Sequence, residues 1–307
     1  MRIAVPDLIS NSYFPAIAAA ELGLFKEERL DLTLELISPL GDCIKALKDG
    51  YASFVGASAH APLLAFPDWQ GAKLLSAQAQ GMYWYLVMRK DLGIARGDLA
   101  ALKNRRIGAV PFVGQALREL LKAAGVDPAQ ANIDIAMPQE TLKPGVNFGV
   151  AVAQALRNGT IDGFFANGMG AEVAVEDGIG DVVLDVRRGD GPKECFNYTL
   201  GAIATTDRVI EDRPDAAAAV IRAVRKAQQL LKADTSNATV AAKRLFPARE
   251  ASLIASVVER DLPYYDPAIS PAVVQSMNAY ARRIGLLAAD VAYEQVVALQ
   301  FRGLWGE

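Results

Sequence analysis

The sequence predicts an α/β protein with two lobes, mainly parallel sheets and a helical C-terminal tail. Short apolar strand segments alternate with helical segments through the first two-thirds of the 307 residues, as in proteins built from parallel strands and crossover helices. A helix, a glycine and a strand recur in the same order twice within that region. From Pro214 onward the pattern is almost entirely helical.

Residues 2–36 are predicted to form a strand, a helix and a second strand. The helix is expected at 13–22, because Pro15 fits only in a first helical turn and Gly23 provides a left-handed stop. Leucines then alternate with polar residues, which is typical of a half-buried strand. Ligands of parallel sheets collect at the carboxyl ends of the strands, so we expect the loop 10–13 to contact one.

The following segments continue the first lobe and lead out of it. A buried strand is expected at 54–57, and Ser58 is predicted to cap a further helix that ends near 66. A strand at 72–79 comes next. The aromatic, β-prone stretch 81–88 is expected to cross to the second lobe.

A second alternation of strands and helices follows Asp98. Its strands are predicted at 106–110, 133–136, 161–166 and 182–186, and its helices at 115–124 and 148–157. The extended stretch 196–206 is expected to return to the first lobe.

The tail helices are predicted at 214–232, 236–245, 250–260, 271–284 and 291–299. We expect them to pack on the first lobe, which then becomes discontinuous. The predicted domains are lobe I at 1–86 plus 198–307 and lobe II at 87–197, with hinge strands near Tyr85 and Tyr198.

An internal repeat relates the two lobes. Residues 46–50 and the strand that ends at Ser58 align without a gap with residues 155–159 and the strand that ends at Asn167. Shared architecture alone is an equally good explanation, because a helix closed by glycine is common. If the repeat is real, Ser58 and Asn167 occupy equivalent strand ends and face a shared cleft.

Composition excludes several classes of function. The net charge is −3 and the basic residues are scattered, so no nucleic-acid partner is predicted. No apolar run reaches the roughly 18 to 20 residues that a bilayer span requires. Cys43 and Cys195 are expected to be buried or semi-buried thiols, with a disulfide between them as the alternative. The single histidine, His60, leaves little for a histidine-rich metal site. Pro6 and Asp7 interrupt the first apolar run, so the sequence given shows no signal peptide.

Several segments resemble a known family. AELGLFKEERLDLTLE, ALKDG with FVGAS, ALRNGTIDGFFAN and LKNRRIGAV are similar to the NMT1/THI5-like periplasmic substrate-binding proteins of ABC importers for nitrate, sulfonate, taurine and thiamine-pyrimidine ligands. The resemblance implies a type II, Venus-flytrap fold with one ligand in the cleft, no catalysis and no cofactor. It also implies an ABC permease as partner, a monomer, and a periplasmic location if a leader was removed.

Two alternatives share this fold. The family includes fungal pyrimidine synthases of thiamine biosynthesis, which use pyridoxal phosphate and iron and consume one of their own histidines. His60 stands near the corresponding position, but the segment 56–60 contains no lysine for the cofactor, and the family's cysteine cluster is reduced to Cys195. These departures argue against the enzyme. The other alternative is a cytoplasmic ligand sensor, which the absence of a leader would suit.

The predicted ligand is small, polar and planar. Its site is expected to combine small polar groups, amides and aromatic rings at strand ends, helix starts and crossings, although capping or core packing explains any one of them taken alone. No catalytic residue and no metal ligand is predicted. The predicted ligand-binding residues are Ser10, Asn11, Ser12, Tyr13, Ser58, His60, Gln80, Trp84, Phe112, Asn147, Phe148, Asn167, Glu172, Asn197 and Tyr198.

Overall fold

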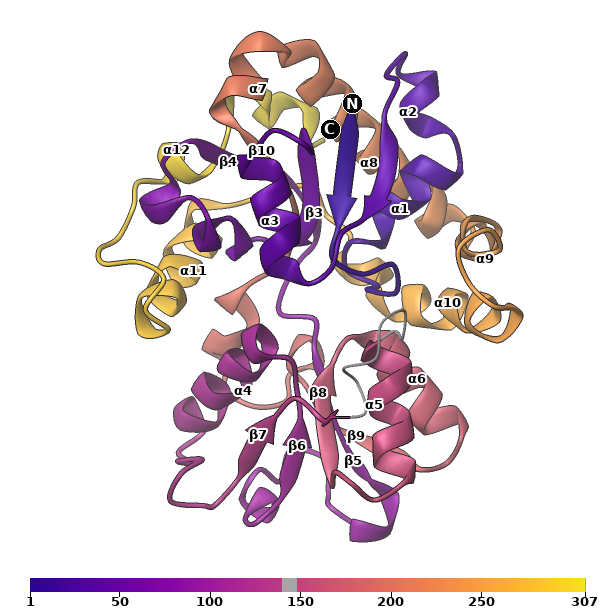
Figure 1. The fold of residues 1–307 in the computed structure, drawn as a ribbon, viewed down its shortest axis with the longest axis vertical. Helices are drawn as coiled ribbons and strands as arrows, with labels where there is room; N and C mark the ends of the chain where they lie inside the picture. The colour runs from indigo at the N-terminus through magenta and orange to yellow at the C-terminus, as the bar shows by residue number, and fades with distance from the viewer. Residues whose placement is uncertain (140–147, 307) are drawn as a thin grey trace. The chain divides into compact units, whose positions relative to one another are not determined.

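The computed structural model describes residues 1–139 and 148–306. It divides into two compact units, each with its own five-stranded sheet (Figure 1). Unit 1 consists of Met1–Gly81 and the chain from Asn197 onward, and unit 2 is Met82–Phe196.

The sheet of unit 1 has the strand order β2-β1-β3-β10-β4. Its strands are β1 (Arg2–Val5), β2 (Thr33–Leu36), β3 (Phe54–Ser58), β4 (Ala72–Ala79) and β10 (Gly201–Thr206). β1 runs parallel to β2 and β3, whereas β10 is antiparallel to both β3 and β4. Gly201 pairs with Ser58 on one side and Ala79 on the other. The carboxyl ends of β1, β2, β3 and β4 therefore lie at the same edge of the sheet as the start of β10.

The sheet of unit 2 has the order β7-β6-β8-β5-β9. Its strands are β5 (Tyr85–Arg89), β6 (Arg106–Gly108), β7 (Asp134–Ala136), β8 (Gly163–Ala166) and β9 (Gly180–Asp185). β6 runs parallel to β7 and β8, and β5 is antiparallel to β8 and β9. Tyr85 pairs with Ala166 and with Asp185, so the start of β5 lies at the edge where β8 and β9 end.

The two sheets have the same topology. β3 and β8 each lie between a parallel strand and an antiparallel one, and Ser58 ends β3 as Asn167 follows β8. The two antiparallel strands, β10 and β5, are the first strands after the chain passes from one unit to the other. Because the chain enters each sheet at the edge where the parallel strands end, the entering strand must run in the opposite direction. The predicted α/β fold with mainly parallel sheets is confirmed.

The first helices of unit 1 follow the local signals in the sequence. α1 (Phe14–Glu21) has Pro15 in its first turn, and Gly23, with φ +78°, separates it from α2 (Leu24–Glu27). α3 (Leu40–Lys48) precedes β3. The helix predicted from Ser58 to 66 is wrong: the 3₁₀ helices η1 (Ala61–Leu64) and η2 (Pro67–Trp69) replace it. An α-helix capped by Ser58 would need the backbone N–H of residue 62 to bond the carbonyl oxygen of Ser58, and Pro62 has no N–H.

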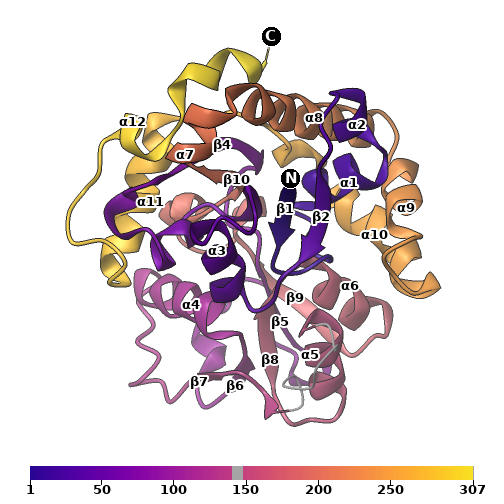
Figure 2. The same cartoon turned by 45° about the horizontal axis from the view of Figure 1, so that its top comes forward.

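The C-terminal tail belongs to unit 1. Its helices are α7 (Asp207–Asp212), α8 (Pro214–Ala233), α9 (Ser236–Ala242), α10 (Ala248–Asp261), η8 (Leu262–Tyr264), α11 (Pro271–Arg283), α12 (Tyr293–Val296) and η9 (Leu299–Leu304). Figure 2 shows α8 and α9 beside α1, which they contact. The indole N–H of Trp305 donates to the carbonyl oxygen of Leu75 at 2.8 Å, so the end of the tail is attached to β4.

Unit 2 packs helices against its own sheet. They are η3 (Lys90–Leu92), η4 (Ala100–Leu102), α4 (Pro111–Ala123), α5 (Phe148–Arg157), α6 (Gly168–Glu176) and η6 (Val186–Arg188), with η7 (Lys193–Tyr198) at the return to unit 1. Val152 and Leu156 of α5 and Ala171 of α6 pack with Val87 and Phe164 of the sheet in one buried cluster. The predicted strand 81–88 begins only at Tyr85.

Both cysteines are buried thiols that form no disulfide, as predicted. Burial, with a smaller contribution from the charge of Asp7, raises the pKa of the Cys43 thiol to about 12.

In the part of the chain that the structure describes, no helix is both long and apolar enough to cross a membrane.

Candidate functional site

The unit 1 residues predicted from the sequence gather at the carboxyl edge of its sheet. The loop 10–13 follows β1, Ser58 ends β3 and Gln80 follows β4. Tyr198 lies shortly before β10, which starts at the same edge. The strand register therefore brings together residues that are far apart in the sequence.

Hydrogen bonds to the nearby carboxylate of Asp7 hold the loop 10–13 in shape. One carboxylate oxygen of Asp7 accepts hydrogen bonds from the backbone N–H groups of Ile9 and Ser10, at 3.0 and 2.8 Å. Its other oxygen accepts a hydrogen bond from the phenol of Tyr13. The side chain of Tyr13, a predicted ligand contact, is thus used to shape the loop.

Three residues from other elements hold the same loop. The Ser12 hydroxyl donates to the Asp261 carboxylate at 3.1 Å, and the Tyr265 hydroxyl donates to the carbonyl oxygen of Asn11 at 2.8 Å. At the start of α1, the backbone N–H of Ala16 donates to Oε1 of Gln78 at 2.9 Å. All three side chains, Asp261, Tyr265 and Gln78, are buried. Their hydrogen bonds fix the path of the chain from 11 to 16.

Gly201 is required beneath this loop. A Cβ atom at position 201 would lie 2.3 Å from the carbonyl oxygen of Ser12 and 2.9 Å from its carbonyl carbon. Because both are backbone atoms, no side-chain rotation would relieve the overlap. The absence of a side chain at the start of β10 allows the loop to lie directly on the sheet.

Ser10 differs from the other hydroxyl residues of the loop. It is fully buried, and its Oγ has no hydrogen-bond partner among the residues that the structure describes. A buried hydroxyl without a partner carries a desolvation cost of about 1–3 kcal/mol. Of the predicted loop residues, Ser10 has the hydroxyl best placed to gain from a bound polar group.

His60 lies in a packed column of rings. Its Nδ1 is 2.8 Å from the hydroxyl oxygen of Thr199, and its ring contacts Tyr280 edge-on with 5.2 Å between centroids. Tyr280 stacks on Tyr198 at 4.6 Å, and the guanidinium of Arg283 lies 4.8 Å from the centre of the Tyr198 ring. Burial lowers the pKa of His60 to about 3, so the ring is neutral at physiological pH. These contacts give His60 and Tyr198 a packing role.

Two other predicted residues of unit 1 differ in their surroundings. The side-chain amide of Gln80 donates to the carbonyl oxygens of Asp266 and Ala268, at 3.0 and 2.7 Å, so it attaches the tail to the end of β4. Asn197 lies in η7 and is partly buried.

Asn167 is the predicted residue of unit 2 that has an available polar atom. It is the N-cap residue of α6, but its side chain makes no capping hydrogen bond. Its Oδ1 is buried and has no hydrogen-bond partner within 1–139 and 148–306. An oxygen at a helix N-terminus without a capping role could instead accept a hydrogen bond from a ligand.

The aromatic candidates of unit 2 lie near the edge of its sheet at which β8 ends and β5 begins. Trp84 immediately precedes β5, with its ring 5.1 Å from that of Tyr83 and 6.0 Å from that of Phe165. Phe112 lies in the first turn of α4, which follows β6. Phe148 begins α5 and packs on the buried cluster of this unit.

The remaining two candidates are less informative. Glu172 lies within α6 and is partly buried. Asn147 lies outside the described residues.

A buried arginine at this edge was missed by sequence reasoning. Arg187 follows β9, is 6% exposed and places its guanidinium carbon 5.7 Å from the centre of the Tyr83 ring. Asp185 accepts a hydrogen bond from the backbone N–H of Arg187 and forms an ion pair with Arg188. The signal available in the sequence was an Arg-Arg pair directly after an apolar strand. Arg187 provides a positively charged group at this edge of the unit 2 sheet, and the site predicted from the sequence contained none.

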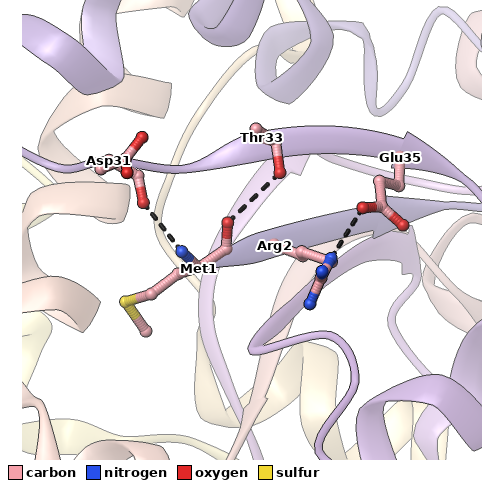
Figure 3. Close-up of a pocket in the computed structure, with 5 residues that line it drawn as sticks. All are labelled: Met1, Arg2, Asp31, Thr33 and Glu35. Carbon is pink, nitrogen blue, oxygen red and sulfur yellow. Dashed lines mark hydrogen bonds and ion pairs between the residues drawn. The ribbon is translucent and has the colours of Figure 1, made fainter.

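A shallow depression of about 240 Å³ lies at the opposite edge of the unit 1 sheet (Figure 3). Arg2 and Thr33, the first residues of β1 and β2, line it with Met1, Asp31 and Glu35. The Arg2 guanidinium is bonded to the Glu35 carboxylate at 2.7 Å. These charges neutralise each other, and we assign no ligand to the depression.

Within the described ranges, no group of three or more histidine, cysteine, aspartate or glutamate side chains is arranged to hold a metal ion.

The model of the family described as NMT1/THI5 like matches residues 10–238. The chain belongs to the NMT1/THI5-like family. The resemblance noted in the sequence is therefore confirmed. The match begins at Ser10 and ends before Asp261 and Tyr265, which hold the loop of this NMT1/THI5-like protein from the tail.

Solved structures with this fold include binding proteins and an enzyme. The periplasmic aliphatic sulphonate-binding protein SsuA from Escherichia coli is 14% identical, with a TM-score of 0.73 over 97% of this chain and 91% of that one. The alkanesulfonate-binding protein SsuA from Xanthomonas axonopodis pv. citri, bound to MOPS, is 17% identical, with a TM-score of 0.71 over 96% and 97%. The desulfurization enzyme DSZB is 14% identical, with a TM-score of 0.67 over 98% and 97%.

No curated protein matches the sequence of this NMT1/THI5-like protein. At such identities the structural likeness establishes the fold, which is the two-sheet α/β fold of periplasmic binding proteins.

Proposed function

We propose that this protein is a solute-binding protein that captures a small, polar, planar organic molecule and delivers it to an ABC permease. Family membership and the fold shared with two sulfonate-binding proteins support this function. The observation that carries it is the Ser10 hydroxyl, which is fully buried and unpartnered among the described residues, in a loop fixed by Asp7, Asp261 and Tyr265. A rigid loop with an unsatisfied polar group suits the capture of a polar ligand.

The chemistry of the unit 2 edge suggests which ligands to expect. Asn167 at the start of α6 provides an acceptor, and the rings of Tyr83 and Trp84 provide flat apolar surface. The buried guanidinium of Arg187 favours an acidic group on the ligand. A planar molecule that carries a sulfonate or carboxylate group is the ligand class that combines these features.

The proposed mechanism is closure about the two connections between the units. A ligand that contacts both units is fully satisfied only in the closed form, so binding shifts the equilibrium toward that form. Moving it from 1:99 to 99:1 requires a preference of about 5.5 kcal/mol, which a few charge-assisted hydrogen bonds and ring contacts can supply. The closed monomer is the form that the permease would recognise.

An enzymatic function has weaker support. DSZB shows that this fold can host an enzyme, so the fold alone does not decide. The raised pKa of Cys43, about 12, keeps that thiol protonated and therefore poorly nucleophilic at neutral pH. For the pyrimidine-synthase alternative, addition of pyridoxal phosphate should produce no Schiff-base absorbance band, and purified protein should retain no iron.

Delivery to an importer implies a periplasmic location in the cell, and a cytoplasmic sensor is the alternative. Fractionation of cells that express the full native gene distinguishes the two. Recovery of the protein in the periplasmic fraction supports the importer function, and exclusive recovery in the cytoplasm supports the sensor.

A thermal-shift panel tests the function and the ligand class together. Its probes are MOPS for sulfonates, benzoate for aromatic carboxylates, cytosine for pyrimidines and benzylamine for amines. A bound probe raises the melting temperature through mass action, and small-angle scattering should then show a smaller radius of gyration at saturation. An unchanged radius with a saturating probe would refute closure.

A further inference from the structure

The chain just after α10 is attached to the candidate loop and to the neighbouring strand end. Asp261 is the last residue of α10, and it accepts a hydrogen bond from Ser12. Tyr265 bonds the carbonyl oxygen of Asn11. The carbonyl oxygen of Tyr264 accepts a hydrogen bond from the backbone N–H of Gln80 at 2.7 Å. One short segment of the tail thus contacts both the loop that follows β1 and the residue that follows β4.

The hydrogen bond from Ser12 meets a requirement of the buried Asp261 carboxylate. Asp261 is fully buried, and a buried carboxylate requires hydrogen-bond donors to compensate for its lost hydration. Ser12 gives its only hydroxyl proton to this carboxylate. That proton is therefore committed within the protein and cannot also be donated to a ligand.

The contact between Tyr265 and Asn11 fixes the backbone of the loop. The hydrogen bond holds the carbonyl group of Asn11, and the next carbonyl group, that of Ser12, lies against Gly201. Two successive peptide groups are thereby fixed immediately after Ser10. Both partners of this arrangement, Tyr265 and Gly201, come from beyond the second connection between the units.

We propose that Asp261 and Tyr265 are positioning residues, which hold the loop 10–13 in its ligand-binding geometry without contacting the ligand. This proposal rests on the proposed function of the loop. It assigns separate tasks to two neighbouring serines: Ser12 anchors the loop and Ser10 contacts the ligand.

Hydrogen exchange of the full-length protein tests the positioning directly. Asp261→Ala and Tyr265→Phe are each expected to increase the exchange rates of backbone amides in 9–14 by at least tenfold, while the amides of α3, in the same unit, keep their wild-type rates. Asp261→Asn retains an acceptor oxygen for Ser12 and should restore slow exchange. A general loss of stability of unit 1 would accelerate exchange in α3 as well.

Tyr293→Phe is the matched control for Tyr265→Phe. The hydroxyl of Tyr293 also donates to a backbone carbonyl of the tail, that of Ile269, but this contact is remote in the sequence from the loop. Its removal should leave the exchange of 9–14 unchanged. Wild-type exchange of 9–14 in both Asp261→Ala and Tyr265→Phe would overturn the proposal. If Asp261→Ala does not fold, Tyr265→Phe, which lacks only one oxygen atom, decides the question.

A second arm measures binding of benzoate, the planar acid of the probe panel, by calorimetry. Tyr265→Phe should weaken benzoate binding by about tenfold relative to the wild type, and Tyr293→Phe should leave it unchanged. Wild-type affinity in Tyr265→Phe, despite accelerated exchange, would overturn the link between loop order and binding. A wild type that binds no probe of the panel would contradict the proposed function, while the exchange rates would still decide the positioning.

Discussion

The hydroxyl of Ser12 donates a hydrogen bond of 3.1 Å to the buried carboxylate of Asp261, which lies 249 positions later in the chain. Its neighbour Ser10 is equally buried, but its hydroxyl has no partner among the residues described. Two serines of one loop therefore have opposite hydrogen-bonding states. This difference predicts opposite consequences of their removal.

Ser12→Ala should destabilise the protein by about 1–3 kcal/mol, because it removes a donor from the buried carboxylate of Asp261. Ser10→Ala should leave the free energy of unfolding unchanged or raise it by about 1 kcal/mol, since it removes an unsatisfied buried hydroxyl. Urea unfolding measures both changes. Equal destabilisation by the two substitutions would show that Ser10 has an internal partner. Ser10→Ala should also weaken binding of the panel probe with the largest thermal shift by about tenfold, which corresponds to about 1.4 kcal/mol.

Gly201→Ala should destabilise unit 1 by about 1–3 kcal/mol or more, since the new methyl group would overlap the backbone of Ser12. Gly41→Ala is the control, because a Cβ at position 41 in α3 meets no atom within 4 Å. It should be neutral or slightly stabilising. The comparison uses thermal unfolding, and a Gly201→Ala variant as stable as Gly41→Ala would contradict the close approach of loop and strand.

His60 should remain neutral in the native protein well below its ordinary pKa of about 6.5. Burial lowers its native pKa to about 3, whereas the unfolded chain takes up the proton near pH 6.5. Between these values the unfolded state binds more protons, so the free energy of unfolding falls as the pH falls, by about 1.6 kcal/mol from pH 6.5 to 5 from this residue alone. His60→Gln should lack that contribution.

NMR provides a direct measurement of this prediction, because His60 is the only histidine of the chain. Its ring carbon shifts should stay constant between pH 7.5 and 5 in the folded protein. A titration centred near pH 6.5 would show that the ring is accessible to solvent.

Asn167→Ala should cost less stability than an ordinary capping substitution, because the Asn167 side chain makes no capping hydrogen bond to α6. We expect less than about 0.5 kcal/mol. Ser270→Ala, which removes a side-chain acceptor for the N–H of Val273 at the start of α11, should cost about 1 kcal/mol. If Asn167 contacts the ligand, its replacement should still weaken binding of the best panel probe. A loss of stability as large as that of Ser270→Ala would indicate a capping role instead.

Much of the fold followed from local patterns. Pro15 and Gly23 set the limits of α1 because each restricts the backbone by itself, whatever the rest of the chain does. The strands β3 and β8 were visible as a repeat in the sequence. They occupy equivalent positions in the two sheets and therefore have similar packing requirements. The helix expected after Ser58 failed because Pro62 lacks the backbone N–H that a helix capped by Ser58 requires at that position, and the 3₁₀ helix η1 forms instead.

The site could be predicted only in part. The sequence indicated the loop 10–13 and Asn167, since polar residues at strand ends and helix starts are a local signal. It did not reveal Asp261, Tyr265 or Arg187 as members of the two edges. A buried polar residue on a helix or after a strand has the same local pattern as an exposed one, and only its distant partner distinguishes the two.

The sequence by itself determined the alternation of strands and helices and the family, because periodicity, proline and glycine act over a few residues. The tertiary structure decided that β10 inserts between β3 and β4, which places Gly201 beneath Ser12. It also decided that the tail returns to hold the loop through Asp261 and Tyr265. Such pairings depend on strand register and helix packing across hundreds of residues, and those long-range contacts leave no periodic trace in the sequence.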